Sequence, residues 1–362
     1  MKSKSQTIGK NHAVTILDVA RESGFSPTTV SIALNGVSPC ENLRAETRRR
    51  IFETAQRLGY RPSESAQVLR RGRSNSIGIV VFDIADPFCT VILRGIDIEL
   101  KKTGYLPIVM DAHNSVDRFK QYVEMLVHRR VEGLIVVANW LFIKLDALKS
   151  AVARNLPAVV VGRDMHRSGI SSVLVDNELG GYLALRHIYE LGHRKIGFLL
   201  GPKQLGDSNP RWAGTRRFAL EAGLALNKSR IKRLPDLSDP LSGFSAGREL
   251  TLELLRSRPE VTAVVAFDDL SAFGAIRALS ESGRNVPNDC SVIGFDDVPM
   301  SALTTPGLTT IRQPMLEMGS FAFESVLLRI RKTDSVKRVT GARTKLMVPE
   351  LMVRGSTRKH SS

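Results

Sequence analysis

The stretch Thr15–Gly36, TILDVARESGFSPTTVSIALNG, constrains the fold of this chain more than any other. Its first half predicts a short helix, because Ile16, Val19 and Ala20 recur at the spacing that places side chains on one helical face. Gly24 is expected to end this helix, since glycine readily takes the positive φ that many helix C-termini adopt.

A second helix is predicted to begin directly afterwards, at Ser26 and Pro27. A serine side chain can cap the first turn, and proline suits a first helical position that needs no N–H. Val30 and Leu34, four residues apart, form the buried stripe of this helix. Two short helices joined by a tight turn are typical of a helix-turn-helix, whose second helix enters the DNA major groove. The same spacing also fits an ordinary helical hairpin in a protein core. The side chains that we expect to contact DNA from this helix are Ser26, Pro27, Thr28, Thr29, Ser31, Ile32 and Asn35.

The stretch resembles the N-terminus of the LacI/GalR family of bacterial transcription regulators, whose pattern is T-I-x-D-V-A-x-x-A-G-V-S-x-x-T-V-S-x-x-L-N-G. The matching positions are Thr15, Ile16, Asp18, Val19, Ala20, Gly24, Ser26, Thr29, Val30, Ser31, Leu34, Asn35 and Gly36. The resemblance implies a ligand-responsive regulator, usually a repressor. Its homodimer would bind a palindromic double-stranded operator, and its core would bind a small-molecule effector.

The charge of the N-terminal part agrees with a nucleic-acid partner. Residues 1–75 contain 13 lysine and arginine residues but six aspartate and glutamate residues, in a chain whose net charge is +16. A basic small domain suits a polyanion, although a solvated basic surface would look the same. A third helix is predicted from Ala45 to Leu58, with Arg48, Arg49 and Arg50 available to phosphates. Its buried face is predicted to comprise Ile51, Phe52, Ala55 and Leu58.

The segment after this helix is predicted to be a hinge. Ser63–Leu69 is predicted to be a single short helix, too short to be stable alone, and the charged link Arg70–Asn75 follows it. It resembles the family's hinge helix, which folds on DNA and inserts a leucine into the minor groove, where an apolar wedge bends the duplex. Leu69 matches that leucine, although it could also be an ordinary packing residue. The hinge residues that the resemblance assigns to DNA are Ser63, Ala66 and Leu69.

The core beyond residue 75 alternates apolar runs with helical stretches. Such alternation predicts parallel sheets with right-handed crossovers, and two series of it predict two doubly wound lobes. The predicted strands are Ile77–Phe82, Leu106–Met110, Gly133–Val137, Ala158–Val161, Val173–Val175, Ile196–Leu200, Val261–Phe267 and Val292–Phe295. The fold class is therefore an α/β core of two doubly wound parallel-sheet lobes with a small all-α helix-turn-helix headpiece. The core resembles the periplasmic-binding-protein fold, which implies that the last segment returns from lobe two to lobe one.

Polar residues follow most of the predicted strands, where ligands of open parallel sheets lie. Their convergence on a cleft suits a polyhydroxylated or otherwise hydrogen-bonding ligand, although each one alone could simply cap a helix. These residues are Asp83, Asp86, Asp111, Asn139, Arg163, Asp176, Asp268, Asp269, Asp296 and Asp297.

Family motifs narrow this list to four effector-binding residues. Arg211 begins a match to R-x-x-G, and Asp296 is the first aspartate of V-I-G-F-D-D; both positions bind effector in the family. Asp268 replaces the family's usual asparagine, so an anion stands where an amide donor is common. Phe88, at an aromatic position of the family, could stack on a ligand ring, although Cys89 beside it weakens that wall. The implied effector is a sugar or a related metabolite.

The remaining features exclude several classes of protein. Cys40, Cys89 and Cys290 are few and far apart, as expected for reduced thiols rather than a disulfide framework or zinc site. We expect no cofactor and no metal. We also expect no membrane partner, because no apolar run approaches the length of a bilayer span. The polar residues 1–14 contain no secretory h-region, so we expect a cytoplasmic, nucleoid-associated protein.

Three alternatives to a ligand-gated regulator remain at this point. A carbohydrate-active enzyme could use the Asp268-Asp269 and Asp296-Asp297 pairs as acid and base, but no catalytic motif accompanies them. We therefore assign no catalytic residue. A transport binding protein would share the core but requires export. An orphan regulator that binds no effector also remains open.

The chain is expected to divide into five parts. They are a flexible tail (1–14), the headpiece (15–60), the hinge and linker (61–75), the effector-binding and dimerisation core (76–357) and a disordered tail (358–362). The C-terminus carries no leucine heptads, so a dimer is expected rather than a tetramerising coil.

Overall fold

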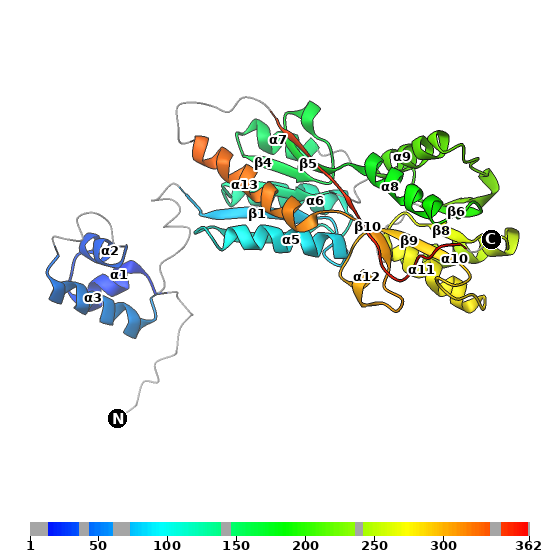
Figure 1. The fold of residues 1–362 in the computed structure, drawn as a ribbon. Helices are drawn as coiled ribbons and strands as arrows, with labels where there is room; N and C mark the ends of the chain where they lie inside the picture. The colour runs from blue at the N-terminus through cyan, green and yellow to red at the C-terminus, as the bar shows by residue number, and fades with distance from the viewer. Residues whose placement is uncertain are drawn as a thin grey trace, which may run out of the picture. The chain divides into compact units, whose positions relative to one another are not determined.

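A computed structural model describes residues 14–35, 43–60, 73–138, 146–235, 242–333 and 342–360 (Figure 1). The chain forms two compact units, residues 1–73 and residues 74–362. None of the helices in these described ranges is both long enough and apolar enough to cross a bilayer.

The N-terminal unit contains the predicted helix-turn-helix. Its helices are α1 (Ile16–Ser23), α2 (Pro27–Asn35) and α3 (Ala45–Leu58). Asp18 accepts hydrogen bonds from the backbone N and Oγ1 of Thr15, 2.9 and 2.7 Å away, which fixes the start of α1. Gly24 ends α1 at φ 78°, and Ser26 Oγ accepts from the backbone N of Thr29 at the start of α2. The predicted turn chemistry is confirmed.

The three helices share one small core. It consists of the buried side chains Val19, Ala20, Val30, Ala33, Ile51 and Ala55. The prediction that Phe52 lies on the buried face of α3 is wrong. Phe52 is 45% exposed, with the guanidinium of Arg48 5.8 Å from its ring centroid, and Thr54 is buried instead. The buried face of α3 is rotated slightly from the one that hydrophobicity alone indicates.

The second unit contains two six-stranded sheets, one in each lobe, which confirms the predicted α/β class (Figure 1). The strand order is β11-β5-β4-β3-β1-β2 in lobe one and β12-β10-β9-β8-β6-β7 in lobe two, and only the β10–β12 pair is antiparallel. Lobe one contains β1 (Ser76–Val81), β2 (Leu106–Asp111), β3 (Gly133–Val137), β4 (Ala158–Val161), β5 (Ser171–Val175) and β11 (Thr344–Met347). Lobe two contains β6 (Ile196–Leu200), β7 (Ile231–Arg233), β8 (Ala263–Val265), β9 (Ser291–Asp296), β10 (Thr309–Arg312) and β12 (Glu350–Met352).

Helices cover both faces of each sheet, which explains why the central strands are continuously apolar. In β1, Ile77 and Ile79 pack towards α5 and α13, whereas Val80 packs towards α6 and α7. Lobe one carries α5 (Pro87–Leu100), α6 (Val116–His128), α7 (Asp146–Ala153) and α13 (Met315–Thr333). Lobe two carries α8 (Asn177–Glu190), α9 (Ser208–Glu221), α10 (Ser242–Ser257), α11 (Asp269–Glu281) and α12 (Met300–Leu303). Two short 3₁₀ turns, η2 (His166–Ser168) and η3 (Lys228–Arg230), complete the described elements.

The chain passes between the lobes three times: after β5, after β10 and after β11. The prediction that the last segment returns to lobe one is therefore incomplete. Helix α13 and strand β11 do return, but β12 then pairs with β10 in lobe two. One strand at the edge of each sheet thus comes from the C-terminal part of the chain.

The prediction of a disordered tail from residue 358 is wrong for residues 358–360. The backbone N of His360 donates to the carbonyl of Leu191, and Arg358 donates from its guanidinium to Oδ1 of Asn288, 2.7 Å away. The carbonyl of Arg358 also lies 3.1 Å from Nε2 of His193, a residue that is almost fully buried. These contacts tie the C-terminal segment to lobe two.

Candidate functional site

Helix α2 presents its N-terminal end to solvent. Ser26, Pro27 and Thr28 are exposed, whereas Thr29, Ser31 and Ile32 are half-buried. Ser31 and Ile32, which we expected to contact DNA, are therefore only partly accessible. Asn35 ends the helix, but its side chain lies outside the described residues. The face that α2 offers to a partner is centred on Pro27 and Thr28.

The start of α3 adds three exposed cations to the same unit. Arg48, Arg49 and Arg50 are all exposed, as predicted. Arg49 makes only an exposed ion pair with Glu53 at 3.7 Å, and the guanidinium of Arg50 lies 5.7 Å from the ring centroid of Phe25. Exposed ion pairs of this kind contribute little to stability, so these charges can be redirected to phosphates. The hinge residues Ser63, Ala66 and Leu69 lie outside the described residues, and their roles stay predictions.

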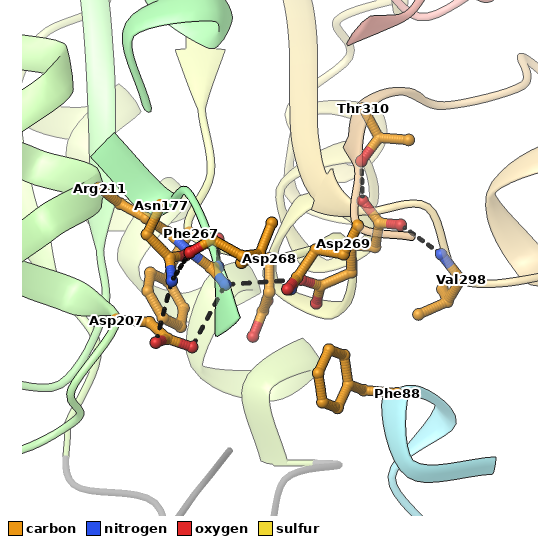
Figure 2. A network of polar contacts seen from close by, with 12 residues as sticks. Phe88, Asn177, Asp207, Arg211, Phe267, Asp268, Asp269, Val298 and Thr310 are labelled. Atoms are coloured by element: carbon orange, nitrogen blue, oxygen red, sulfur yellow. Dashed lines mark hydrogen bonds and ion pairs between the residues drawn. The ribbon is translucent and has the colours of Figure 1, made fainter. Parts of the chain in front are cut away.

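A pocket between the lobes brings together the four predicted effector residues, Phe88, Arg211, Asp268 and Asp296 (Figure 2). Phe88 comes from α5 of lobe one, and its ring faces the polar network of lobe two. Four further lining residues escaped the sequence analysis: Leu205, Asp207, Phe267 and Gln313. Of these four residues, Asp207 could have been found from the sequence, because an acid four residues before Arg211 can form an ion pair with it.

Arg211 is held by protein groups on every side and is only 8% exposed. Its Nε donates to Oδ1 of Asn177 and its Nη1 donates to the carbonyl of Phe267, both over 2.7 Å. Its Nη2 lies 3.6 Å from a carboxylate oxygen of Asp207 and 3.6 Å from one of Asp296. The guanidinium also stacks 3.7 Å from the ring centroid of Phe295.

The glycine of the R-x-x-G motif explains why this arginine reaches the pocket. A Cβ on Gly214 would lie 1.7 Å from the carbonyl oxygen of Glu178, and one on Gly181 would lie 2.0 Å from the carbonyl of Arg211. Only glycines allow α8 and α9 to pack this closely, and that packing positions Arg211 beside Asn177.

Asp268 is the N-cap of α11, so the capping alternative is also correct for this residue. Its Oδ1 accepts from the backbone N of Ser271, 2.7 Å away. Burial raises the pKa of Asp268 above its usual value, while the Ser271 hydrogen bonds and the charge of Arg211 oppose that shift.

Asp296 ends β9 with φ 118°, a backbone conformation that non-glycine residues rarely adopt and that marks local strain. Gln313 holds it twice: Gln313 Nε2 donates to Oδ1 over 2.6 Å, and the Gln313 backbone N donates to the carbonyl of Asp296. Burial raises the pKa of the Asp296 carboxyl well above its usual value, and the nearby Asp269 and Asp268 charges raise it further. Arg211 opposes this shift.

Two acids that we expected in the cleft are structural instead. Asp269 is completely buried, and its carboxylate accepts from the backbone N of Val298, Ser301 Oγ and Thr310 Oγ1 at 2.5–2.9 Å (Figure 2). Burial raises the pKa of Asp269 to about 7. Asp297 forms ion pairs with Arg312 and Arg354 at 2.7 and 2.6 Å. Both acids stabilise lobe two rather than line the pocket.

The other strand-end residues mostly cap local backbone. Asp86 and Asp176 accept from the first turns of α5 and α8, and Asp83 and Asp111 accept from backbone N atoms two residues ahead. Arg163 is half-buried, which lowers its pKa, and Asn139 lies outside the described residues. None of the described residues in this group lines the pocket. Cys89, which we expected to weaken the wall beside Phe88, is fully buried in the core of lobe one and does not line the pocket.

Asp83, Asp111 and His113 place ligand-type atoms within 4.8 Å of one another, the one such group of three among the described residues. Exposed acidic groups often lie this close without an ion, so we assign no metal to them.

Comparisons with known proteins identify both units. Residues 15–63 match the model for bacterial regulatory proteins of the lacI family, and residues 185–357 match that for a periplasmic binding protein-like domain. The transcriptional repressor CytR of Escherichia coli K12 is 31% identical over 359 residues, 99% of each chain. The repressor PurR of Erwinia tasmaniensis is 34% identical over 319 residues, 87% of this chain and 90% of its own.

Solved structures show the same relationship. The Lac repressor dimer bound to operator and the anti-inducer ONPF is 27% identical, with a TM-score of 0.78 over 96% of this chain and all of its own. The complex of the regulator CelR with cellobiose is 26% identical, with a TM-score of 0.67 over 95% of this chain and 99% of its own. The relatives are repressors, which sets the enzyme alternative aside. The chain therefore belongs to the LacI family of bacterial regulatory proteins and is a DNA-binding transcriptional regulator.

Proposed function

We propose that this chain is a transcriptional repressor whose homodimer binds a palindromic operator and whose core binds a small hydroxylated metabolite. The observation that carries the proposal is the pocket in which Phe88 of lobe one meets Arg211, Asp268 and Asp296 of lobe two. A ligand bound there contacts both lobes at once. It can therefore favour one arrangement of the lobes over another, which a regulated DNA-binding protein requires.

The headpiece would supply the DNA contacts. The exposed Pro27 and Thr28 at the start of α2 are small enough to approach base edges in the major groove, and Arg48–Arg50 can neutralise phosphates. Two headpieces in a dimer would read two half-sites, so the operator should have two-fold symmetry. A protein with this activity works on the chromosome, in the cytoplasm.

The hinge Ser63–Leu69 would transmit the signal. It is short, and a lone helix of that length folds only when it is paired or bound. In the operator complex the two Leu69 side chains would enter the minor groove and bend the duplex. A ligand that changes the lobes would withdraw these wedges, leaving phosphate contacts but little specificity.

Selection from random duplex DNA by the full-length protein tests this function. We expect enrichment of one site with two-fold symmetry, and enrichment should disappear when the exposed Thr28 and the neighbouring Ile32 are both replaced by glutamate. The acid-to-amide variant Glu124→Gln, on the exposed face of α6, should select the same site as the natural sequence. Failure to enrich any site, or enrichment of an asymmetric one, contradicts the proposal.

A further inference from the structure

Among the residues that the structure describes, more negative than positive side chains line the pocket between the lobes. Asp207, Asp268 and Asp296 line it, and Arg211 is the one cation in this described lining. A fourth acid, Asp269, follows Asp268 in the sequence and lies close enough to raise the pKa of Asp296. Arg163, which follows β4 in lobe one, does not line this pocket.

Arg211 is already engaged by protein groups, which makes it a poor grip for an anionic ligand. Two of its nitrogens already donate to Asn177 and to the carbonyl of Phe267, and its third lies between Asp207 and Asp296. The guanidinium is thus shared between two carboxylates at 3.6 Å, so it compensates the charge of neither completely.

Each of two acids keeps one oxygen that no described residue satisfies. Oδ1 of Asp268 accepts from Ser271, and Oδ1 of Asp296 accepts from Gln313. Oδ2 of either residue accepts no hydrogen bond from the described part of the chain. Burial raises the pKa of both carboxyls, and Arg211 and the hydrogen bonds that each carboxyl accepts oppose this shift.

The remaining walls of the pocket suit a positive charge. Phe88 lines it from lobe one, and the face of an aromatic ring attracts a cation. Phe267 lines it from lobe two, where the guanidinium of Arg211 already lies 4.5 Å from its ring centroid. Figure 2 shows the ring of Phe88 facing Asp207 and Asp268, which line the same pocket. A ligand seated there would have acceptors on one side and an aromatic ring on the other.

We propose that the effector is a hydroxylated molecule carrying a protonated amine, such as an amino sugar, whose ammonium group binds between Asp268 and Asp296. This inference rests on the proposed function, because it concerns the same pocket. A neutral sugar would satisfy the free oxygens but leave the excess negative charge. An anionic ligand would increase it. A protonated amine supplies three donors together with the missing charge.

Calorimetric titration of the full-length protein with matched sugars tests the inference. The pairs are glucosamine with glucose and galactosamine with galactose, and N-acetylglucosamine is the neutral amide control. At a pH that keeps the amines protonated, at least one amino sugar should bind about tenfold or more tightly than its neutral counterparts. Equal or tighter binding by the neutral members, or no measurable binding by either amine, overturns the inference.

The variant Asp268→Asn removes one charge and keeps the oxygen that caps α11, so the fold should survive. We expect about a tenfold loss of amino-sugar affinity and no loss for a neutral sugar. Asp207→Asn provides a second removal in the same pocket if the first variant unfolds. Glu124→Gln changes the net charge equally outside the pocket, and an equal loss in that variant contradicts the inference.

The DNA selection described above uses no ligand, so the two proposals fail separately. A chain that selects a symmetric operator but prefers neutral sugars retains its proposed function and loses this inference. A chain that prefers the amine but selects no DNA site loses its proposed function and retains this inference.

Discussion

The guanidinium of Arg211 on α9 donates to the side-chain oxygen of Asn177 on α8, 2.7 Å away. Asn177 in turn donates from Nδ2 to Asp207 over 3.0 Å. Asn177 does not line the pocket, yet it orients two residues that do. Asn177 is therefore a positioning residue: it holds Arg211 and Asp207 in place but does not itself contact the pocket.

Asn177→Ala should weaken both the fold and the effector site. Loss of hydrogen bonds to two charged groups should lower the free energy of unfolding by about 1.5–3 kcal/mol. Effector affinity should fall while operator affinity of the ligand-free protein stays unchanged. Urea unfolding and calorimetry measure the two effects. Asn227→Ala, which removes a side-chain cap at η3, is the control and should lower stability without changing effector affinity.

Stability should depend on pH through Asp269, whose pKa burial raises to about 7 from an ordinary value of 3.8. The folded state then binds more protons than the unfolded state between these values, so stability falls as pH rises from about 4 to 7. Asp269→Asn should remove this part of the slope. We expect the stability of the natural protein relative to the variant to drop by at least about 1 kcal/mol between pH 5 and pH 7.5. Urea unfolding of both proteins at pH 5 and pH 7.5 measures this difference in the free energy of unfolding. The same difference at both pH values would show that Asp269 does not titrate in this range.

Ile32 should influence base choice even though it is half-buried. Many family members carry an arginine at this position, which can grip guanine with two hydrogen bonds, whereas isoleucine can only contact a thymine methyl. Ile32→Arg should therefore select a different base at one position of each half-site. Repeating the DNA selection with the variant measures this. Identical preferences at every position would exclude Ile32 as a reading residue.

Leu69→Ala should reduce specificity more than affinity. Loss of the wedge removes the bend but not the phosphate contacts, so operator affinity should fall far more than affinity for random DNA at the same salt concentration. Effector affinity of the free protein should stay unchanged. The ratio of operator affinity to random-DNA affinity is the quantity to measure. An unaltered ratio would show that the hinge only connects the headpiece to the core and does not contribute to specificity.

The elements predicted correctly are those with strong local signals. The capped helices α1 and α2 and the apolar strands β1, β3 and β9 all show such signals. The strands missed by the sequence analysis are short or exposed. Strand β11 has three exposed residues out of four, and β7 has only three residues, none of them buried. Their pairing depends on distant partners, which local periodicity does not reveal.

The site was predictable by type but not by orientation. Asp268 and Asp269 are adjacent in the sequence, yet the first caps α11 at the pocket and the second is buried against Val298 and Thr310. Successive residues at a helix start point in different directions, so only the packing of the lobe decides which one meets a ligand. Gln313 was missed because its place at the pocket depends on tertiary packing: it follows β10 and donates a hydrogen bond to Asp296.

The effect of a pocket ligand on operator affinity tests most directly whether this chain is a ligand-gated regulator. Operator affinity of the full-length protein is measured by fluorescence anisotropy at one fixed salt concentration. The titration is done with and without a saturating compound that calorimetry shows to bind the pocket. Coupling between two binding sites typically changes affinity about 5- to 150-fold, and we predict a change in that range for the operator and none for random DNA. Operator affinities within twofold of each other, with the compound bound, would contradict a ligand-gated regulator.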